Sequence, residues 1–150
     1  MQMGIASGEF DVVWCIESVC HAPTKRLFLA EAYRALKLGG RIAIADTFLS
    51  EGRMEPRDAR HTRRWLDAWA IPNMAKASEF GKDLEEVGFG DVRFQDVTKD
   101  ARRSSRLLFI GTMLVLPIGI AQYLIGNRTK VQTWNMVAVI YHYLTLKKDL

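Results

Sequence analysis

Residues 10–46 read FDVVWCIESVCHAPTKRLFLAEAYRALKLGGRIAIAD, and they contain the clearest secondary-structure signals of the chain. Residues 10–16 are apolar and rich in β-branched side chains, which predicts a strand buried on both faces, as in a parallel sheet. Residues 24–37 repeat apolar side chains at helical spacing, and a pair of glycines follows that predicts the helix end. Residues 41–48 predict a second buried strand. Strand, helix and strand in this order form a βαβ unit, so the two strands should be parallel.

Composition excludes several classes of protein. The chain has 150 residues, of which 49% are hydrophobic and 25% charged, so it has the size and composition of one globular domain. Its two cysteines, Cys15 and Cys20, are too few for a disulfide framework or a four-ligand zinc site. We therefore expect a reducing, cytoplasmic location and no metal. The net charge of +4 comes from basic residues that lie among acids, so we expect no nucleic-acid partner.

The segments after this unit predict helices and one more strand. Residues 52–64 are rich in charge and predict a polar linker, which leads into an amphipathic helix that ends before Pro72. Ser78 is a plausible N-cap for a helix over residues 79–87. Residues 91–97 alternate polar and apolar side chains, which predicts a strand near the sheet edge.

Residues 107–125 form a run of 19 uncharged residues bounded by an arginine on each side. We consider two interpretations. The first is a buried helix pair broken near Pro117 and Gly119. The second is contact with a membrane, since this length just suffices to cross a bilayer. Arginines that precede the run would then lie at the lipid headgroups.

Three strands are fewer than a doubly wound α/β domain needs to bury its sheet. We divide the chain into a central strand–helix–strand (1–50), a lid or linker helix (51–77), a helix with an edge strand (78–100) and a helical substrate cap (101–150). The shortfall predicts that part of the sheet is missing.

Several short motifs point to one family. The strand segment FDVVW is followed by Glu17-Ser18, by His21-Ala22-Pro23, by a helix with EAYRAL and by LKLGG, and later come EVGFGDV and DVT. In order and spacing these motifs resemble class I S-adenosylmethionine-dependent methyltransferases of the small-molecule branch, which includes tocopherol, sterol and sarcosine methyltransferases. The resemblance covers roughly residues 5–100.

The resemblance implies a partial Rossmann-like sheet, mostly parallel, with a helical lid insertion. It also implies S-adenosyl-L-methionine as cofactor and O-, C- or N-methylation of an apolar small-molecule acceptor. The family's glycine-rich turn after the first strand and acidic residue after the second strand are absent. Cys20 stands where a related branch carries a catalytic glutamate. We therefore expect a carboxyl-terminal fragment, in which the amino-terminal strands and the last strand are missing.

In such a sheet the ligand lies beyond the carboxyl ends of the strands. The resemblance implies that Trp14, Cys15 and Ile16 line the cofactor. Glu17 and His21 are the candidates for the catalytic base or for orienting the acceptor. The alternative is that Glu17 only places a charge at the start of the next helix and that His21 is a surface residue.

Aromatic side chains suit a hydrophobic acceptor, because they offer a large apolar surface with few rotatable bonds. Asp46, after the second strand, reaches the pocket or is the N-cap of the next segment. Ordinary helix packing is the alternative interpretation of the aromatic residues. The candidates for substrate binding are Ser18, Trp65, Trp69, Ile71, Pro72 and His142.

Two other functions remain open at this point. One is a non-catalytic partner module derived from a methyltransferase, which associates through an exposed sheet edge. The other is a membrane-associated protein that uses residues 107–125.

Overall fold

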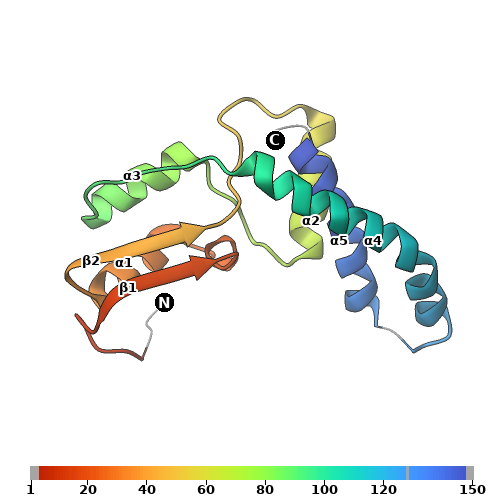
Figure 1. Cartoon of the computed structure of the whole chain (residues 1–150), viewed down its shortest axis with the longest axis horizontal. Coiled ribbons are helices and arrows are strands. Elements are labelled where there is room, and N and C mark those ends of the chain that lie inside the picture. The colour runs from red at the N-terminus through yellow and green to blue at the C-terminus, as the bar shows by residue number, and fades with distance from the viewer. Residues whose placement is uncertain (1–3, 128, 148–150) are drawn as a thin grey trace. The chain divides into compact units, whose positions relative to one another are not determined.

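The computed structural model describes residues 4–127 and 129–147. The chain forms two compact units, drawn with their elements labelled in Figure 1. The sheet unit comprises Met1–Glu51 and Pro72–Phe94, and the helical unit comprises Gly52–Ile71 and Gln95–Leu150. The elements in chain order are β1 (Phe10–Ile16), the 3-10 turn η1 (Val19–His21), α1 (Lys25–Ala35), β2 (Leu36–Ala45), α2 (Pro56–Ala68), α3 (Ala77–Val87), α4 (Thr98–Leu124) and α5 (Lys130–Lys147).

In the sheet unit, β1 and β2 pair in parallel and are joined through α1. Trp14 lies opposite Ala43, and Cys15 lies opposite Ile44. The predicted βαβ unit with parallel strands is therefore confirmed, and the structure is a mixed α/β fold with a short parallel sheet.

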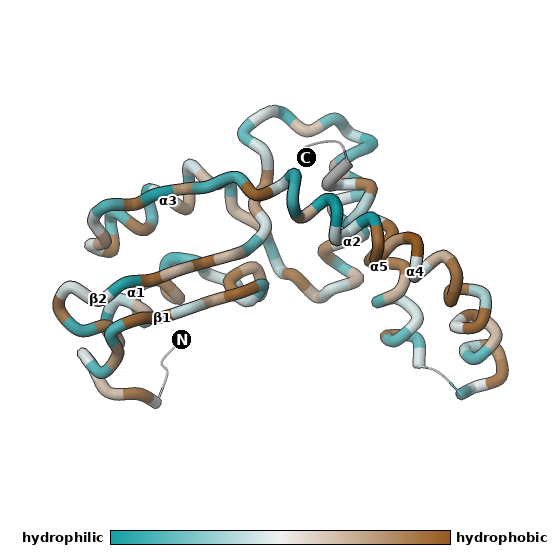
Figure 2. Tube along the Cα trace, viewed as in Figure 1, coloured by the Kyte–Doolittle hydropathy of each residue, from teal (hydrophilic) through white to brown (hydrophobic). Residues whose placement is uncertain are grey.

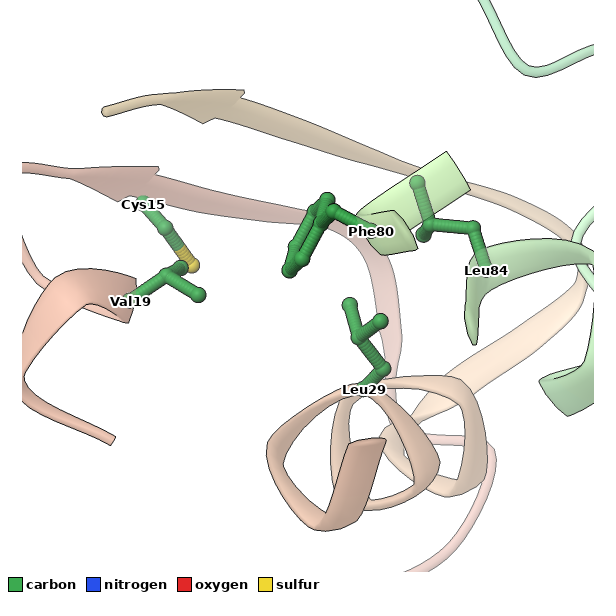
Figure 3. Packing of buried hydrophobic residues seen from close by; sticks show 5 residues of the cluster. All are labelled: Cys15, Val19, Leu29, Phe80 and Leu84. Carbon is green, nitrogen blue, oxygen red and sulfur yellow. The ribbon is translucent and has the colours of Figure 1, made fainter. Parts of the chain in front are cut away.

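One face of this sheet is covered. Cys15 of β1 packs with a valine of η1, a leucine of α1 and two residues of α3, and Figure 3 shows the five side chains converging. Ile42 and Ile44 of β2 pack against the same cluster. Because side chains alternate along a strand, Val13 and Cys15 of β1 and Ile42 and Ile44 of β2 point to the same face and contribute to this core. The five side chains are those of Cys15, Val19, Leu29, Phe80 and Leu84.

The other face is open, so the expectation of strands buried on both faces is wrong. Val12, Trp14 and Ile16 alternate with the core residues and are 50%, 73% and 57% exposed. The apolar character of β1 predicted burial on both sides, but only one side meets the core of the sheet unit. The sheet unit therefore presents an apolar sheet surface.

The boundary between α1 and β2 differs from the expected one. The helix ends at Ala35 and β2 begins at Leu36, so the glycine pair does not end the helix. The pair instead lies in an irregularity of the strand pairing, where Gly39 has a φ of 77°. A Cβ on Gly40 would lie 2.9 Å from the carbonyl oxygen of Lys37. Glycine is needed for this bend of β2.

Two helix starts also differ. The segment expected to be a linker is shorter, because α2 already begins at Pro56, a residue suited to the first helical position. Ser78 does not cap α3. The N-cap is Lys76, and the hydroxyl of Ser78 donates to a carboxylate oxygen of Glu51 over 2.7 Å. The end of α3 agrees with expectation, since Gly88 follows it with a φ of 116°.

Residues 91–97 form no strand, which corrects the expectation of a third strand. A strand needs a neighbour for its backbone hydrogen bonds, and alternation of side chains does not supply one. Phe94 instead packs edge-on against Phe48, with ring centroids 6.2 Å apart.

In the helical unit, α4 continues past Pro117, so the break expected there is wrong. Proline removes a single backbone hydrogen bond, and the turns on both sides continue the helix. The interpretation of residues 107–125 as buried is also wrong for this unit, because only 6% of the apolar window of α4 is buried. Figure 2 shows the hydrophobic colour running along α4. Helix α4 ends at Leu124, and Gly126, with a φ of 79°, follows it.

Candidate functional site

The carboxyl ends of β1 and β2 are fastened together by Asp46. One carboxylate oxygen, Oδ2, accepts hydrogen bonds from the backbone N–H of Ser18 at 3.1 Å and of Cys20 at 3.0 Å. The N–H of Glu17 donates to the carbonyl of Ala45 at 2.9 Å. Asp46 is thus not the cap of a following helix. Its hydrogen bonds to the N–H groups of Ser18 and Cys20 fix the turn between β1 and η1. We call this pair of hydrogen bonds the Asp46 clasp.

Glu17 lies in this turn in an unusual conformation. Its φ is 46°, in the left-handed region that non-glycine residues rarely adopt. A residue persists in such a conformation where its surroundings determine it, and this occurs often at functional sites. The Sγ atom of Cys20 and one carboxylate oxygen each of Glu17 and Asp46 all lie within 4.8 Å of one another.

The electrostatics of the turn favour protonated side chains. Burial raises the pKa of Glu17, the nearby Asp46 carboxylate raises it further, and His21 acts in the opposite direction. Burial is also the main cause that raises the pKa of the Cys20 thiol to about 12. A carboxylate whose pKa is raised is a stronger base than an ordinary glutamate side chain and suits proton transfer with a substrate.

Lys25 is a structural contributor that the sequence did not single out. Its buried ammonium donates to the carbonyls of Cys20 at 2.8 Å, Ala22 at 2.7 Å and Asn73 at 3.0 Å. Burial lowers the pKa of this group. A lysine near the start of a helix is usually solvated, so nothing in the local pattern indicated that it ties η1 to a segment almost fifty residues later.

The three residues predicted to line the cofactor do not share one surface. Trp14 and Ile16 lie on the open face of the sheet, whereas Cys15 is buried on the covered face. Beside the clasp there is a hollow of about 10 Å³, lined by residues that include Cys20, Lys25 and Asp46. This volume suits a single water molecule and not a nucleoside. The role of Trp14, Cys15 and Ile16 toward the cofactor stays a prediction.

The aromatic candidates gather in the helical unit. Trp69 stacks on His142 with ring centroids 5.7 Å apart, and the centroid of Trp65 lies 5.2 Å from that of His142. The hydroxyl of Ser105 lies 3.1 Å from His142 Nε2. Burial lowers the pKa of His142. Ile71 is buried in the same unit.

The remaining substrate candidates, Ser18 and Pro72, belong to the sheet unit and are exposed. Ser18 contributes its backbone N–H to the Asp46 clasp, and His21 ends η1 with an exposed side chain. The roles expected for all of these residues stay predictions.

The glycine-rich turn of the family has no counterpart after a strand. The sequence contains one Gly-Xaa-Gly, at Gly88-Phe89-Gly90, and it follows a helix. Backbone amides of a strand-to-helix turn are what cradle a nucleotide, so these glycines do not supply such a loop.

Comparison with known proteins shows which proteins this chain is similar to. A family model described as a methyltransferase domain matches residues 1–44. A 2-methyl-6-phytyl-1,4-hydroquinone methyltransferase of Synechocystis is 34% identical over 103 residues, which cover 65% of this chain and 32% of that protein. The resemblance to class I S-adenosylmethionine-dependent methyltransferases is confirmed. A sterol 24-C-methyltransferase of Yarrowia lipolytica is 34% identical over 64% of the chain and 26% of its own length.

The methyltransferase fold is supported by a solved structure as well. A crystal structure from Galdieria sulphuraria, titled as a sarcosine dimethylglycine methyltransferase, matches with a TM-score of 0.64 over 97% of this chain and 51% of that one. Its sequence identity is 18%, so it bears on the fold alone. The chain spans about a third of the length of the curated methyltransferases reported above.

Proposed function

We propose that this chain takes part in S-adenosylmethionine-dependent methyl transfer to an apolar small-molecule acceptor. The observation that carries the proposal is the Asp46 clasp, which holds Glu17 at a φ of 46° at the carboxyl ends of two parallel strands. Ligands of open α/β sheets bind at this edge. The confirmed relation to methyltransferases supplies the type of reaction.

In this proposal Glu17 acts as the general base. It accepts the proton that an acceptor hydroxyl loses as its oxygen becomes methylated. The raised pKa of Glu17, caused chiefly by burial, suits that task. His21, the last residue of η1, orients the acceptor or shares the proton. The alternative roles, a charge at a helix start and a surface histidine, predict no effect of either residue on turnover.

The cofactor is proposed to meet this chain at its reactive end only. When bound, S-adenosylmethionine supplies an activated methyl group. The last residues of β1, Trp14 to Ile16, would border the reactive end of the cofactor, whereas the hollow beside the clasp is too small for the nucleoside. We therefore assign no adenosine-binding role to any residue of this sequence.

The acceptor is proposed to be hydrophobic. The stacked cluster of Trp65, Trp69 and His142 offers a rigid aromatic surface, and the indole N–H of Trp65 and Nδ1 of His142 are buried without a hydrogen-bond partner. Unpaired buried polar atoms are uncommon, and beside aromatic rings they suit a polar group of a largely apolar molecule. The names of two relatives, a phytylhydroquinone and a sterol methyltransferase, are consistent with this class of acceptor.

A chimera tests the proposal. Residues 10–150 would be joined to the amino-terminal part of the Synechocystis methyltransferase, and transfer of radiolabelled methyl to a phytylhydroquinone would be measured. We expect turnover, and we expect Glu17→Gln to lower kcat by at least about 100-fold, since general bases contribute on this scale. Glu85→Gln, on the exposed side of α3, is the matched control and should leave kcat unchanged. A folded chimera without turnover, or one insensitive to Glu17→Gln, contradicts the proposal.

We also propose that the reaction takes place in the cytoplasm, because Cys15 and Cys20 are free thiols, which suit a reducing compartment. We also propose that the edges of the two-stranded sheet take part in association with another subunit or segment, because unpaired strand edges readily accept a further strand.

A further inference from the structure

The less exposed residues of helix α4 lie on one narrow stripe of its surface. From residue 105 onward, its less exposed positions recur at steps of four and three, which form one stripe, and α5 packs along it. Phe109 stacks on Tyr143 with ring centroids 4.7 Å apart, and Ser105 lies 3.1 Å from His142. The stripe consists of Ser105, Phe109, Thr112, Leu116 and Gly119.

Among the residues whose burial the structure describes, the buried ones of this helix pair are small or polar. They are Ser105 and Gly119 on α4, with Ala138 and Thr145 on α5. Leu116 lies in the stripe, but most large aliphatic side chains of α4 lie outside it, among them Leu107, Leu108, Leu114, Ile118, Ile120 and Leu124. A helix pair of a water-soluble protein has the opposite arrangement, with large apolar residues inside. Small and polar residues between helices, with aliphatic residues outside, are typical of helices surrounded by lipid.

The length and the flanking charges agree with this pattern. No charged residue occurs between Arg106 and Arg128. The helical part of this segment, residues 107–124, would be roughly 27 Å long at the α-helical rise, close to the roughly 30 Å of a bilayer's hydrocarbon core. In the described part of the chain, α4 is the one helix apolar and long enough to cross a membrane. Basic residues precede and follow it, as lipid phosphates require.

We propose that the apolar segment of α4 inserts into a lipid bilayer that carries anionic headgroups. A second protein helix would cover a single stripe of α4, whereas the exposed aliphatic side chains lie on all sides outside the α5 contact. Lipid chains cover such a surface from every direction. The inference does not rest on methyl transfer, because it uses only the helical unit.

Vesicle flotation tests the proposal with the whole chain. The protein would be mixed with vesicles of phosphatidylcholine, alone or with phosphatidylglycerol, and centrifuged through a density gradient. We expect the protein to float with both, and to float more completely when phosphatidylglycerol is present, because Arg103 and Arg106 precede the inserted segment.

Substitutions distinguish insertion from non-specific adhesion. Leu114→Glu introduces a charge at a side chain that is 74% exposed near the middle of the apolar segment, and we expect it to lower the vesicle-bound fraction at least ten-fold. Leu38→Glu is the matched control: Leu38 is a fully exposed leucine of the sheet unit, and its substitution should leave flotation unchanged. Circular dichroism checks that both variants retain their helices.

Three results would overturn the proposal. The chain could fail to float with either vesicle. The Leu114→Glu variant could float as well as the wild type, which would place the membrane contact elsewhere in the chain. It could also form a defined dimer in solution that Leu114→Glu dissociates and that ignores vesicles, which would make a second copy the occupant of the α4 surface.

Discussion

Single residues determine the candidate site, and Asp46 is the clearest case. Its position after the second strand could be predicted from the sequence, as could its place at the ligand-binding edge of the sheet. Its partners could not, because the amides of Ser18 and Cys20 precede it by 28 and 26 residues. The same holds for Lys25 and the carbonyl of Asn73. Such contacts depend on the fold and leave no trace in local periodicity.

Asp46→Ala should loosen the turn between β1 and η1. Two backbone N–H groups lose their acceptor, and we expect a loss of about 2 kcal/mol in the free energy of unfolding. Hydrogen exchange by NMR gives the local readout: the amides of Ser18 and Cys20 should lose protection. Glu85→Ala, at an exposed position of α3, is the control and should change neither the free energy of unfolding nor the protection of these two amides. Unchanged protection in Asp46→Ala would show that the clasp is not formed.

The thiol of Cys20 should be unreactive in the native protein. With a pKa of about 12, its thiolate fraction at pH 8 is about 1000-fold smaller than that of a thiol with a pKa of 9, and alkylation follows the thiolate. Mass spectrometry after iodoacetamide treatment measures this directly. Fast modification of Cys20 in the folded chain, at a rate close to that in urea, would contradict the described environment.

The same group has a consequence for stability at alkaline pH. The folded state keeps the Cys20 proton up to about pH 12, whereas an unfolded thiol loses it near 9. Between these values the folded state binds more protons, so stability falls as the pH rises. Urea unfolding of Cys20→Ala should therefore show a smaller loss of stability from pH 9 to 11 than the wild type. An equal loss in both proteins would argue against the raised pKa.

At the scale of elements, local patterns predicted β1, α1 and α3 to within a few residues, because apolar periodicity and glycine caps act within one element. Local patterns failed where the pairing of strands determines the secondary structure. Residues 91–97 alternate like a strand but have no ladder, and β2 begins at Leu36 because its first residue pairs with Phe10 ahead of the irregularity at the glycine pair. Pairing depends on residues far away in the sequence, so a local pattern does not reveal it.

Gly88 provides a test of how α3 ends. Its φ is 116°, and a Cβ there would lie 3.1 Å from the Cζ and Oη atoms of Tyr33. Gly88→Ala should therefore lower the free energy of unfolding by about 1–3 kcal/mol. Gly90→Ala is the matched control, since a Cβ there would meet nothing within 4 Å, and its stability should stay the same or rise slightly. Equal effects of the two substitutions, measured by urea unfolding, would contradict the described helix end.

At the scale of the whole molecule, two facts belong together. The chain spans about a third of the length of the methyltransferases reported above, and its sheet unit exposes Val12, Trp14 and Ile16 on one face. Parallel sheets are normally covered on both faces. The family could be predicted from the motifs of residues 10–46, because those motifs are local. The methyl acceptor could not be predicted, because the candidate residues for binding it come from segments far apart in the sequence.

The open sheet surface predicts association of the isolated chain. In detergent-free buffer we expect light scattering to report a mass above the 17.1 kDa of one chain. Trp14→Lys should lower that mass, since it places a charge on a side chain that is 73% exposed. A wild type that is monodisperse at the mass of one chain and unfolds cooperatively would speak against association through the sheet.

Calorimetric titration of the 150-residue chain with S-adenosylmethionine tests most directly how much of the active site these residues supply. The sequence holds the turn fastened by Asp46 but no glycine-rich loop after a strand, and the hollow beside the clasp measures about 10 Å³. We predict no binding in the micromolar range for the chain alone. A micromolar dissociation constant, abolished by Asp46→Ala, would show that this chain encloses the cofactor by itself and would contradict our account.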